Sequence, residues 1–327
     1  MIYHIVDDQI IELTDEYIEY LYHAYLPDDS LIVADNKSLD SITIPSKITN
    51  IIFDDCTNPI DIEKHLQKIN LDRNYIMLSG LYKYHHSTTL DPRVKFFPFW
   101  AIWMNLPHGR LMPMPNHKFS TQPKKYKFSC LNGTGWNHRI LTYLSLINKS
   151  YFKEMVFTFG NRQHCQDNLN ELILTEEEKQ EFNSLNHNIK FLDNELTDID
   201  LSVNHPAYRE TYINLVTETT INNSTPMLSE KTFKPIIAGQ LFILIASPGA
   251  VQFLRNLDID TFDDIIDHHY DTVIDPRTRI KLALDQLDQL DRVDLNSIYN
   301  QIKPRLIKNS EYFLSQRFRD QFKLSFG

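Results

Sequence analysis

The sequence predicts an α/β fold of two Rossmann-like domains that face a cleft, followed by C-terminal helices. In the first third of the chain, short apolar segments alternate with segments of helical spacing, and this alternation restarts after residue 125. Residues 278–326 then keep amphipathic helical spacing almost throughout. Because ligands of parallel sheets bind beyond the carboxyl ends of the strands, polar residues that follow strands are the candidates for a site.

The first third is expected to form a parallel sheet with helical crossovers. Strand-like segments lie at residues 2–6, 30–34, 50–53 and 75–78. Helical spacing covers residues 15–25 and 60–69. The aromatic run VKFFPFWAIWM at residues 94–104 is expected to be buried packing.

A segment of different composition separates the two halves. Residues 105–125 hold four prolines and several cations without any hydrophobic period, which indicates a linker or surface crossover. The predicted organisation is an N-terminal α/β domain, a linker, a Rossmann-like domain and C-terminal helices, at residues 1–105, 106–125, 126–275 and 276–327.

The second half repeats the strand and helix pattern. Strands are expected at residues 126–131, 155–159, near 189–192, and at 211–217 and 241–246. Helices are expected at residues 137–146, near 175–185, and at 231–238. Gly239 then has the position of a helix C-cap.

Glycine is scarce in this chain. It has 8 glycines in 327 residues, where average usage of about 7% would give roughly 23. Collagen-like repeats, Gly-rich linkers and multiple glycine-built phosphate loops are therefore excluded. Half of the glycines fall in two short segments, as Gly133 and Gly135 in one and Gly239 and Gly249 in the other.

Charge and cysteine content narrow the class of protein. A formal net charge of −10 disfavours non-specific binding to nucleic acid or anionic membranes. Three cysteines without a C-x-x-C spacing indicate reduced thiols in a cytoplasmic protein. No secretory leader is visible, and the longest apolar stretch, residues 241–246, is too short for a membrane span.

The first candidate site is the turn between the strand at 126–131 and the helix at 137–146. Gly133 and Gly135 allow the backbone to bend and approach a ligand, and free N–H groups at the helix start favour phosphate. Arg139 could fork onto a diphosphate. The segment matches neither G-x-G-x-x-G nor G-x-x-x-x-G-K-[ST], and a simple strand-to-helix turn with a surface arginine has the same local sequence.

The second candidate site combines a carboxylate after a strand with a Glu–Lys pair at a helix start. Glu218 follows the strand at 211–217, and Glu230 and Lys231 open the next helix. A carboxylate accepts hydrogen bonds from ribose hydroxyls, and an ammonium neutralises a phosphate. A solvated ion pair is the alternative interpretation. Pro235 predicts that the helix starts near this residue or kinks there.

The segment TETTINNSTPMLSEKTFKPIIAGQLFILIASPGAVQFLRNL resembles the C-terminal donor-binding motif of the alpha-1,3-fucosyltransferase family and of related phage and bacterial glycosyltransferases. The matching positions are Glu218, Ser229-Glu230-Lys231 and residues 240–249, and Arg139 matches an upstream arginine after a strand and a polar turn. The resemblance spans roughly residues 126–262. Thr217-Glu218-Thr219 replaces the family's Phe-Glu-Asn, and Leu228 replaces an aromatic residue.

The resemblance implies a GT-B fold and an inverting glycosyltransferase that needs neither metal nor cofactor. It implies a GDP- or UDP-linked sugar donor and a glycan or other hydroxyl acceptor. By that implication Arg139 and Lys231 bind the diphosphate, Glu230 binds the ribose, and Glu218 contacts the sugar or its leaving group. The same donor site includes Asn132, Gly133 and Ser229.

The general base has to come from the N-terminal domain, where the resemblance gives no match. His85 follows the strand at 75–78 and is the leading candidate, with His86, Asp54 and Asp55 as alternatives. Adjacent strand residues point to opposite faces, so Asp54-Asp55 is better explained as a turn cap than as a metal pair. His268-His269 has no third ligand at suitable spacing, and no metal is predicted.

Two other functions remain open from the sequence. One is a phage-type transferase that glycosylates hydroxymethylated DNA bases; the net charge disfavours DNA, although the linker is cationic. The linker cations are Arg110, His117, Lys118, Lys124 and Lys125. The other is a non-catalytic nucleotide-sugar-binding protein on the same scaffold.

Overall fold

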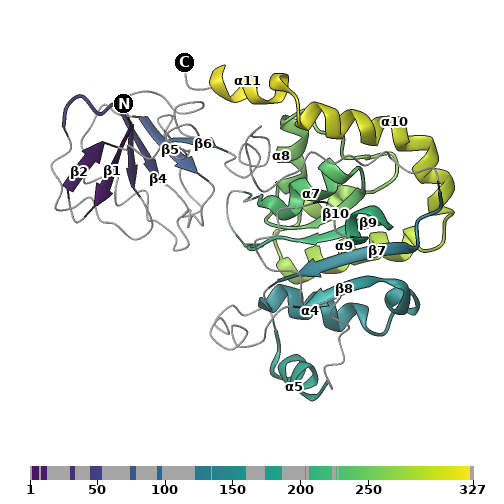
Figure 1. The fold of residues 1–327 in the computed structure, drawn as a ribbon. Coiled ribbons are helices and arrows are strands. Elements are labelled where there is room, and N and C mark those ends of the chain that lie inside the picture. The colour runs from purple at the N-terminus through teal and green to yellow at the C-terminus, as the bar shows by residue number, and fades with distance from the viewer. Residues whose placement is uncertain are drawn as a thin grey trace.

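The structure is a computed structural model with a mixed α/β architecture (Figure 1). It describes residues 2–6, 9–12, 30–33, 45–53, 74–78, 94–97, 122–133, 135–159, 174–185, 203, 206–222, 226 and 228–324. These residues form two separate sheets, and helices flank the second one. The mixed α/β class is therefore confirmed, and the second sheet is compatible with a Rossmann-like domain.

The N-terminal sheet has six strands in the order β2-β1-β3-β4-β5-β6. The strands are β1 Ile2–Val6, β2 Gln9–Glu12, β3 Ser30–Val33, β4 Asn50–Phe53, β5 Asn74–Leu78 and β6 Val94–Phe97. All pairs are parallel except β1 with β2. The four strands expected here are confirmed.

Two features of this sheet differ from the expectation. Only two residues separate β1 from β2, a connection that permits an antiparallel hairpin, and the sequence reading did not include β2. The first residues of the aromatic run at 94–104 form β6, a strand that was not expected and that extends the parallel sheet beyond β5, while the burial expected of this run lies outside the described residues. The helices expected at 15–25 and 60–69, and linker residues 106–121, lie outside the described residues.

One row of side chains shows where the N-terminal sheet is buried. Tyr3 of β1 lies opposite Leu31 of β3, which in turn lies opposite Ile51 of β4. All three side chains are buried. Directly opposite residues of neighbouring strands share one face, so this row marks a core face of the sheet.

The C-terminal sheet is entirely parallel, in the order β10-β9-β7-β8. Its strands are β7 Tyr126–Asn132, β8 Val156–Phe159, β9 Thr211–Thr217 and β10 Leu241–Ile245. The chain runs from β7 outward to β8 and then returns to the other side of β7 as β9. The order of strands therefore reverses between β7 and β9, which is the switch point where ligands of doubly wound sheets bind.

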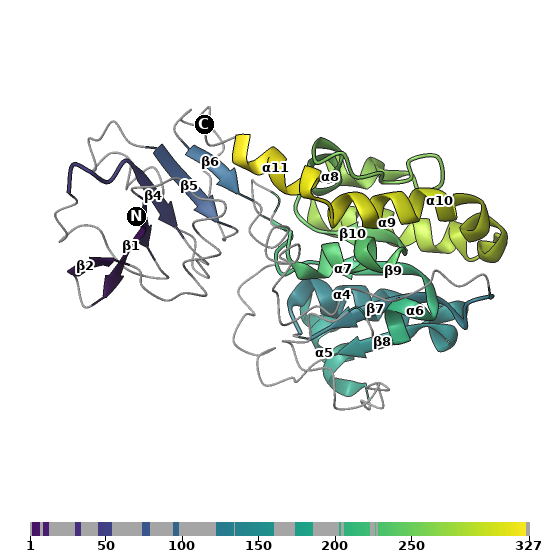
Figure 2. The same ribbon diagram turned by 45° about the horizontal axis from the view of Figure 1, so that its top comes forward.

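Helices cover this sheet and continue the chain beyond it (Figure 2). The α-helices are α4 Asn137–Leu146, α5 Glu176–Ser184, α6 Pro206–Arg209, α7 Glu230–Ala238, α8 Ala250–Asn256, α9 Pro276–Leu290, α10 Leu295–Phe313 and α11 Gln316–Leu324. The connections β7–α4–β8 and β9–α7–β10 run in opposite directions along the sheet, so right-handed crossovers place α4 and α7 on opposite faces. Helix α7 packs against α10.

Most expected elements of this half are confirmed, from α4 at its predicted bounds to the C-terminal helices. Helices α6 and α8 are additions, and the strand expected near 189–192 lies outside the described residues. Helix α7 does not start near Pro235, which lies inside it: the helix begins at Glu230, because the Ser229 side chain caps it there. No helix among the described residues is long and apolar enough to cross a membrane.

Two glycines in this domain have left-handed backbone. Gly239 ends α7 with φ 63° and ψ 45°, and the Gln240 N–H donates to the Pro235 carbonyl at 2.9 Å, which confirms its role as C-cap. Gly249 precedes α8 with φ 82°. Gly239 follows α7, and Gly249 lies between β10 and α8. The positive φ at both positions would strain an L-residue, so glycine is favoured there.

Gly249→Ala is expected to lower the free energy of unfolding by about 1 kcal/mol. No atom lies within 4 Å of the added Cβ, so the cost comes from the positive φ of 82° and not from a clash. Urea unfolding measures the loss. Gly249→Asn serves as the control, since asparagine tolerates this conformation better, and equal stability of wild type and Gly249→Ala would refute the assignment of strain.

Candidate functional site

The carboxyl ends of three neighbouring strands are joined by polar side chains at the switch point. Asn132 ends β7, and its backbone N–H donates to Thr158 Oγ1 of β8 at 3.0 Å. On the other side the Thr217 hydroxyl, at the end of β9, donates to Asn132 Oδ1. Asn132 is buried. It therefore fixes the edge of the sheet at which a ligand is expected.

The first turn of α4 is tied to the end of β9 by two consecutive side chains. Arg139 Nη2 donates to the Thr217 carbonyl at 3.0 Å, and His138 Nε2 lies 2.8 Å from the Glu218 carbonyl. Since a carbonyl can only accept, Nε2 of His138 carries the proton. Both side chains are almost completely buried, each in a residue that is 1% exposed.

Glu218 joins β9 to the first turn of α7. The residue is 0% exposed. Its Oε1 accepts from Ser229 N at 2.9 Å and Thr232 Oγ1 at 2.5 Å, and its Oε2 accepts from Ser229 Oγ at 2.6 Å and Thr219 N at 3.3 Å. The negative charge also lies beside the N-terminus of a helix, which stabilises it.

The charged residues that open α7 are more accessible. Lys231 Nζ lies 2.6 Å from Glu230 Oε1. The Lys231 side chain is 27% exposed and that of Glu230 only 10%. Burial opposes ionisation of Glu230, but the charges of Lys231 and Lys234 outweigh it and hold the pKa of this carboxyl below its ordinary range. The site therefore presents an accessible ammonium beside an ionised carboxylate.

The structure brings six of the predicted site residues to one edge of the sheet. They are Asn132, Arg139, Glu218, Ser229, Glu230 and Lys231. Gly133 follows β7 and is exposed. The four candidates for the base, His85, His86, Asp54 and Asp55, lie outside the described residues, so that assignment stays a prediction.

Three further residues of the site received no role from the sequence. Thr232 and His138 bind the Glu218 carboxylate and carbonyl, respectively. Lys234 contributes charge to Glu230. Lys234 could have been found from the sequence, because residues four apart on a helix are neighbours and Glu230 and Lys234 have this spacing. For His138 there was none, because its partner is 80 residues away in the chain.

The histidine pair at 268–269 forms local contacts. His268 is buried, with Nδ1 2.8 Å from the Tyr270 hydroxyl and Nε2 2.8 Å from the Thr261 carbonyl. His269 pairs with Asp267 at 2.9 Å. Within the described ranges, no three His, Cys, Asp or Glu side chains are grouped to hold a metal ion. Cys130 is a free buried thiol, and burial raises its pKa to about 12, so it is not a nucleophile.

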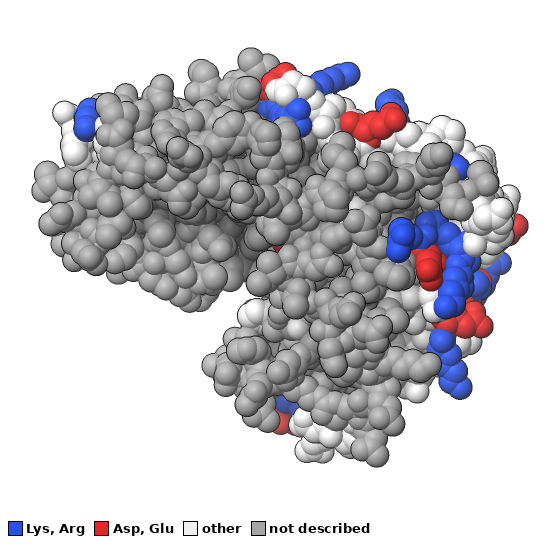
Figure 3. All heavy atoms as spheres, in the orientation of Figure 1, with Lys and Arg blue, Asp and Glu red and all other residues white. Residues whose placement is uncertain are grey.

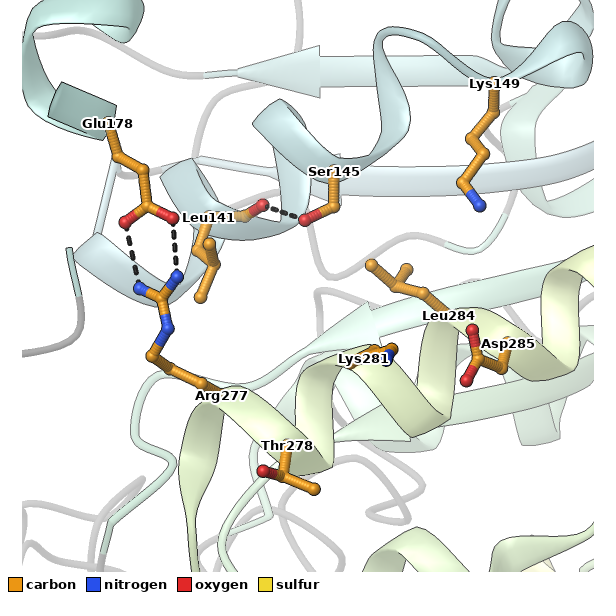
Figure 4. A pocket seen from close by; sticks show the side chains of 9 residues that line it. All are labelled: Leu141, Ser145, Lys149, Glu178, Arg277, Thr278, Lys281, Leu284 and Asp285. Atoms are coloured by element: carbon orange, nitrogen blue, oxygen red, sulfur yellow. Dashed lines mark hydrogen bonds and ion pairs between the residues drawn. The ribbon is translucent and has the colours of Figure 1, made fainter. Parts of the chain in front are cut away.

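A cavity of about 450 Å³ lies elsewhere, between α4, α5 and α9 (Figure 4). Glu178 of α5 accepts two hydrogen bonds from Arg277 of α9, at 2.6 and 2.9 Å, along its wall. Lys281 and Asp285 line the same cavity. Side chains of both charges line this space, and the lining includes none of the predicted site residues.

No protein-family model matches the chain, and no curated protein matches it significantly.

The stability of the fold is expected to depend on pH through His138. Burial, together with the charge of Arg139, lowers the pKa of His138 from 6.5 to about 3. The unfolded chain therefore binds a proton below pH 6.5 that the folded chain does not bind until about pH 3. Folded stability should fall as the pH falls through this window, by about 1.4 kcal/mol per pH unit.

Urea unfolding of wild type and His138→Gln between pH 7 and pH 4 isolates this contribution, since glutamine keeps a donor but does not titrate. The wild type should lose stability faster than the variant as the pH falls. Parallel stability curves would show that His138 is not held neutral.

Proposed function

We propose that this chain is an inverting, metal-independent glycosyltransferase of GT-B architecture. In this proposal it transfers a sugar from a GDP- or UDP-linked donor to the hydroxyl of a glycan or small acceptor. One observation carries the proposal: the accessible Lys231 ammonium and the ionised Glu230 open α7 at the switch point of a parallel sheet.

The arrangement suits the diphosphate and ribose of a donor. Lys231 offers positive charge to the diphosphate. Glu230 accepts hydrogen bonds from ribose hydroxyls most strongly when it is ionised, and its lowered pKa keeps it ionised at neutral pH. Asn132 ends β7 on the other side of the switch point and Gly133 follows it, and both line the donor site in this proposal.

The proposed chemistry is a direct displacement at the anomeric carbon. The acceptor oxygen forms the new bond as the bond between the sugar and the diphosphate breaks, and the electron pair leaves with the diphosphate. Lys231 stabilises the charge that develops on this leaving group. The acceptor proton passes to a base of the N-terminal domain, for which His85 is the predicted residue.

The surface favours a small or glycan acceptor over DNA. On the face shown in Figure 3, the described Lys and Arg side chains have Asp and Glu side chains among them. The net charge of −10 also opposes binding to a polyanion.

A panel of nucleotide sugars tests the proposed function. Each donor is incubated with hydroxyl acceptors, and release of the free nucleoside diphosphate is measured with and without a chelator. We expect release from one GDP- or UDP-sugar, unaffected by the chelator. Donor binding without release for any acceptor would support a non-catalytic binding protein. Release that requires hydroxymethylated DNA, with salt-dependent retention on it, would support the DNA-modifying alternative.

A further inference from the structure

We propose that His138 and Arg139 are positioning residues of the donor site. They hold the carboxyl end of β9 and, through Glu218, fix the first turn of α7, which carries Glu230 and Lys231. The effect on donor use rests on the function proposed above, whereas the effect on α7 does not. In this account Arg139 acts behind the site and does not bind the diphosphate directly.

The need for such a support follows from the strand pairing. Residues of β7 and β9 pair up to Ser129 and Asn214, so β9 continues beyond its pairing with β7. On its other side β9 stays paired with β10 as far as Thr217 and Ile245, and the Glu218 N–H donates to the Ile245 carbonyl at 2.9 Å. The backbone at the end of β9 is therefore paired with β10, whereas on the side of β7 the Thr217 hydroxyl makes the contact, with Asn132 Oδ1.

His138 and Arg139 add support from α4. Their bonds to the carbonyls of Glu218 and Thr217, at 2.8 and 3.0 Å, satisfy two consecutive buried acceptors. A buried carbonyl that loses its donor is costly, so these contacts restrict the backbone of residues 217 and 218. This restriction sets the position of the Glu218 side chain.

Glu218 transmits the position to α7. Its two carboxylate oxygens bind the backbone and hydroxyl of Ser229 and the hydroxyl of Thr232. The same Ser229 hydroxyl accepts from the Lys231 N–H at 3.3 Å. A continuous set of hydrogen bonds thus runs from α4 through the end of β9 to the backbone of Lys231, and each side chain before Lys231 in this set is buried.

A pair of variants that differ by one methylene tests the proposal. In His138→Gln the amide nitrogen can occupy the place of Nε2 and donate to the Glu218 carbonyl, whereas in His138→Asn it is too short to do so. The control is Ser310→Ala, because Ser310 Oγ donates to the Ile237 carbonyl at 2.8 Å and so makes the same kind of buried bond at the other end of α7.

Amide hydrogen exchange, measured by NMR, reports on α7 without any substrate. We expect the Ser229 amide to exchange at least tenfold faster in His138→Asn than in wild type, and within threefold of wild type in His138→Gln and Ser310→Ala. Donor KM should rise at least tenfold in His138→Asn and recover in His138→Gln.

The outcomes separate the two proposals. Unchanged exchange at Ser229 in His138→Asn, or an equal change in Ser310→Ala, would overturn the positioning role even if the chain turns over a donor. Faster exchange at Ser229 in His138→Asn alone, in a chain that uses no nucleotide sugar, would retain the positioning role and remove the proposed function.

Discussion

Glu218→Ala is expected to lower the free energy of unfolding by about 3–5 kcal/mol. The carboxylate is fully buried and accepts four hydrogen bonds, from Ser229 N, Ser229 Oγ, Thr232 Oγ1 and Thr219 N. Alanine would leave the buried donors without an acceptor and would open a space at the N-terminus of α7. Equilibrium unfolding in urea measures the loss.

Two further variants show whether the charge or the contacts matter. Glu218→Gln keeps one acceptor oxygen but turns an amide donor toward other donors, so a loss of about 1–3 kcal/mol is expected. Glu311 is exposed on α10, and Glu311→Ala should change stability by less than about 0.5 kcal/mol. If Glu218→Ala is no more destabilising than Glu311→Ala, Glu218 does not hold α7 in place.

Lys231→Ala is expected to lower kcat/KM for the nucleotide sugar by about 10²–10³-fold, which corresponds to roughly 3–4 kcal/mol of transition-state stabilisation. The Lys231 side chain is 27% exposed, and Lys234 still offsets the charge of Glu230 when Lys231 is removed, so the fold should be retained at a smaller cost than in Glu218→Ala. Initial rates of nucleoside diphosphate release, with the donor that the panel identifies, measure the effect.

A lysine elsewhere provides the matched control. Lys281 is exposed on α9 and lines the separate cavity, so Lys281→Ala should keep the wild-type rate. Lys231→Arg keeps the charge and should retain more activity than Lys231→Ala. A loss of less than threefold in Lys231→Ala would exclude this residue from the stabilisation of the leaving group.

Local sequence patterns predicted the elements of the C-terminal domain well. The helix at 137–146 and the strand at 211–217 have the bounds that periodicity indicated, and Gly239 caps α7 as its position suggested. Helix periodicity, strand length and helix caps are set by residues close together in the chain, so local patterns are enough to predict them.

In the N-terminal sheet, the two-residue connection between β1 and β2 has no distinctive turn sequence, so β2 was not predicted.

The sequence indicated which polar residues lie together at this edge of the sheet, but not the direction of their side chains. Glu218 and Arg139 were expected to face a ligand, and the structure shows both buried against backbone groups or helix donors. Arg139 meets Thr217 across 78 residues of chain. Whether a charged side chain points into a site or behind it depends on such long-range contacts, which a strand-to-helix motif does not determine.

The central claim is that the first turn of α7 binds the diphosphate of a nucleotide. Calorimetric titration of GDP and UDP into wild type, Lys231→Ala and Lys281→Ala tests it most directly. We predict that one of the two nucleotides binds the wild type and Lys281→Ala equally, and that Lys231→Ala binds it at least tenfold more weakly, a loss of about 1.4 kcal/mol. Equal affinity of Lys231→Ala and wild type, or no binding of either nucleotide to the wild type, would contradict the claim.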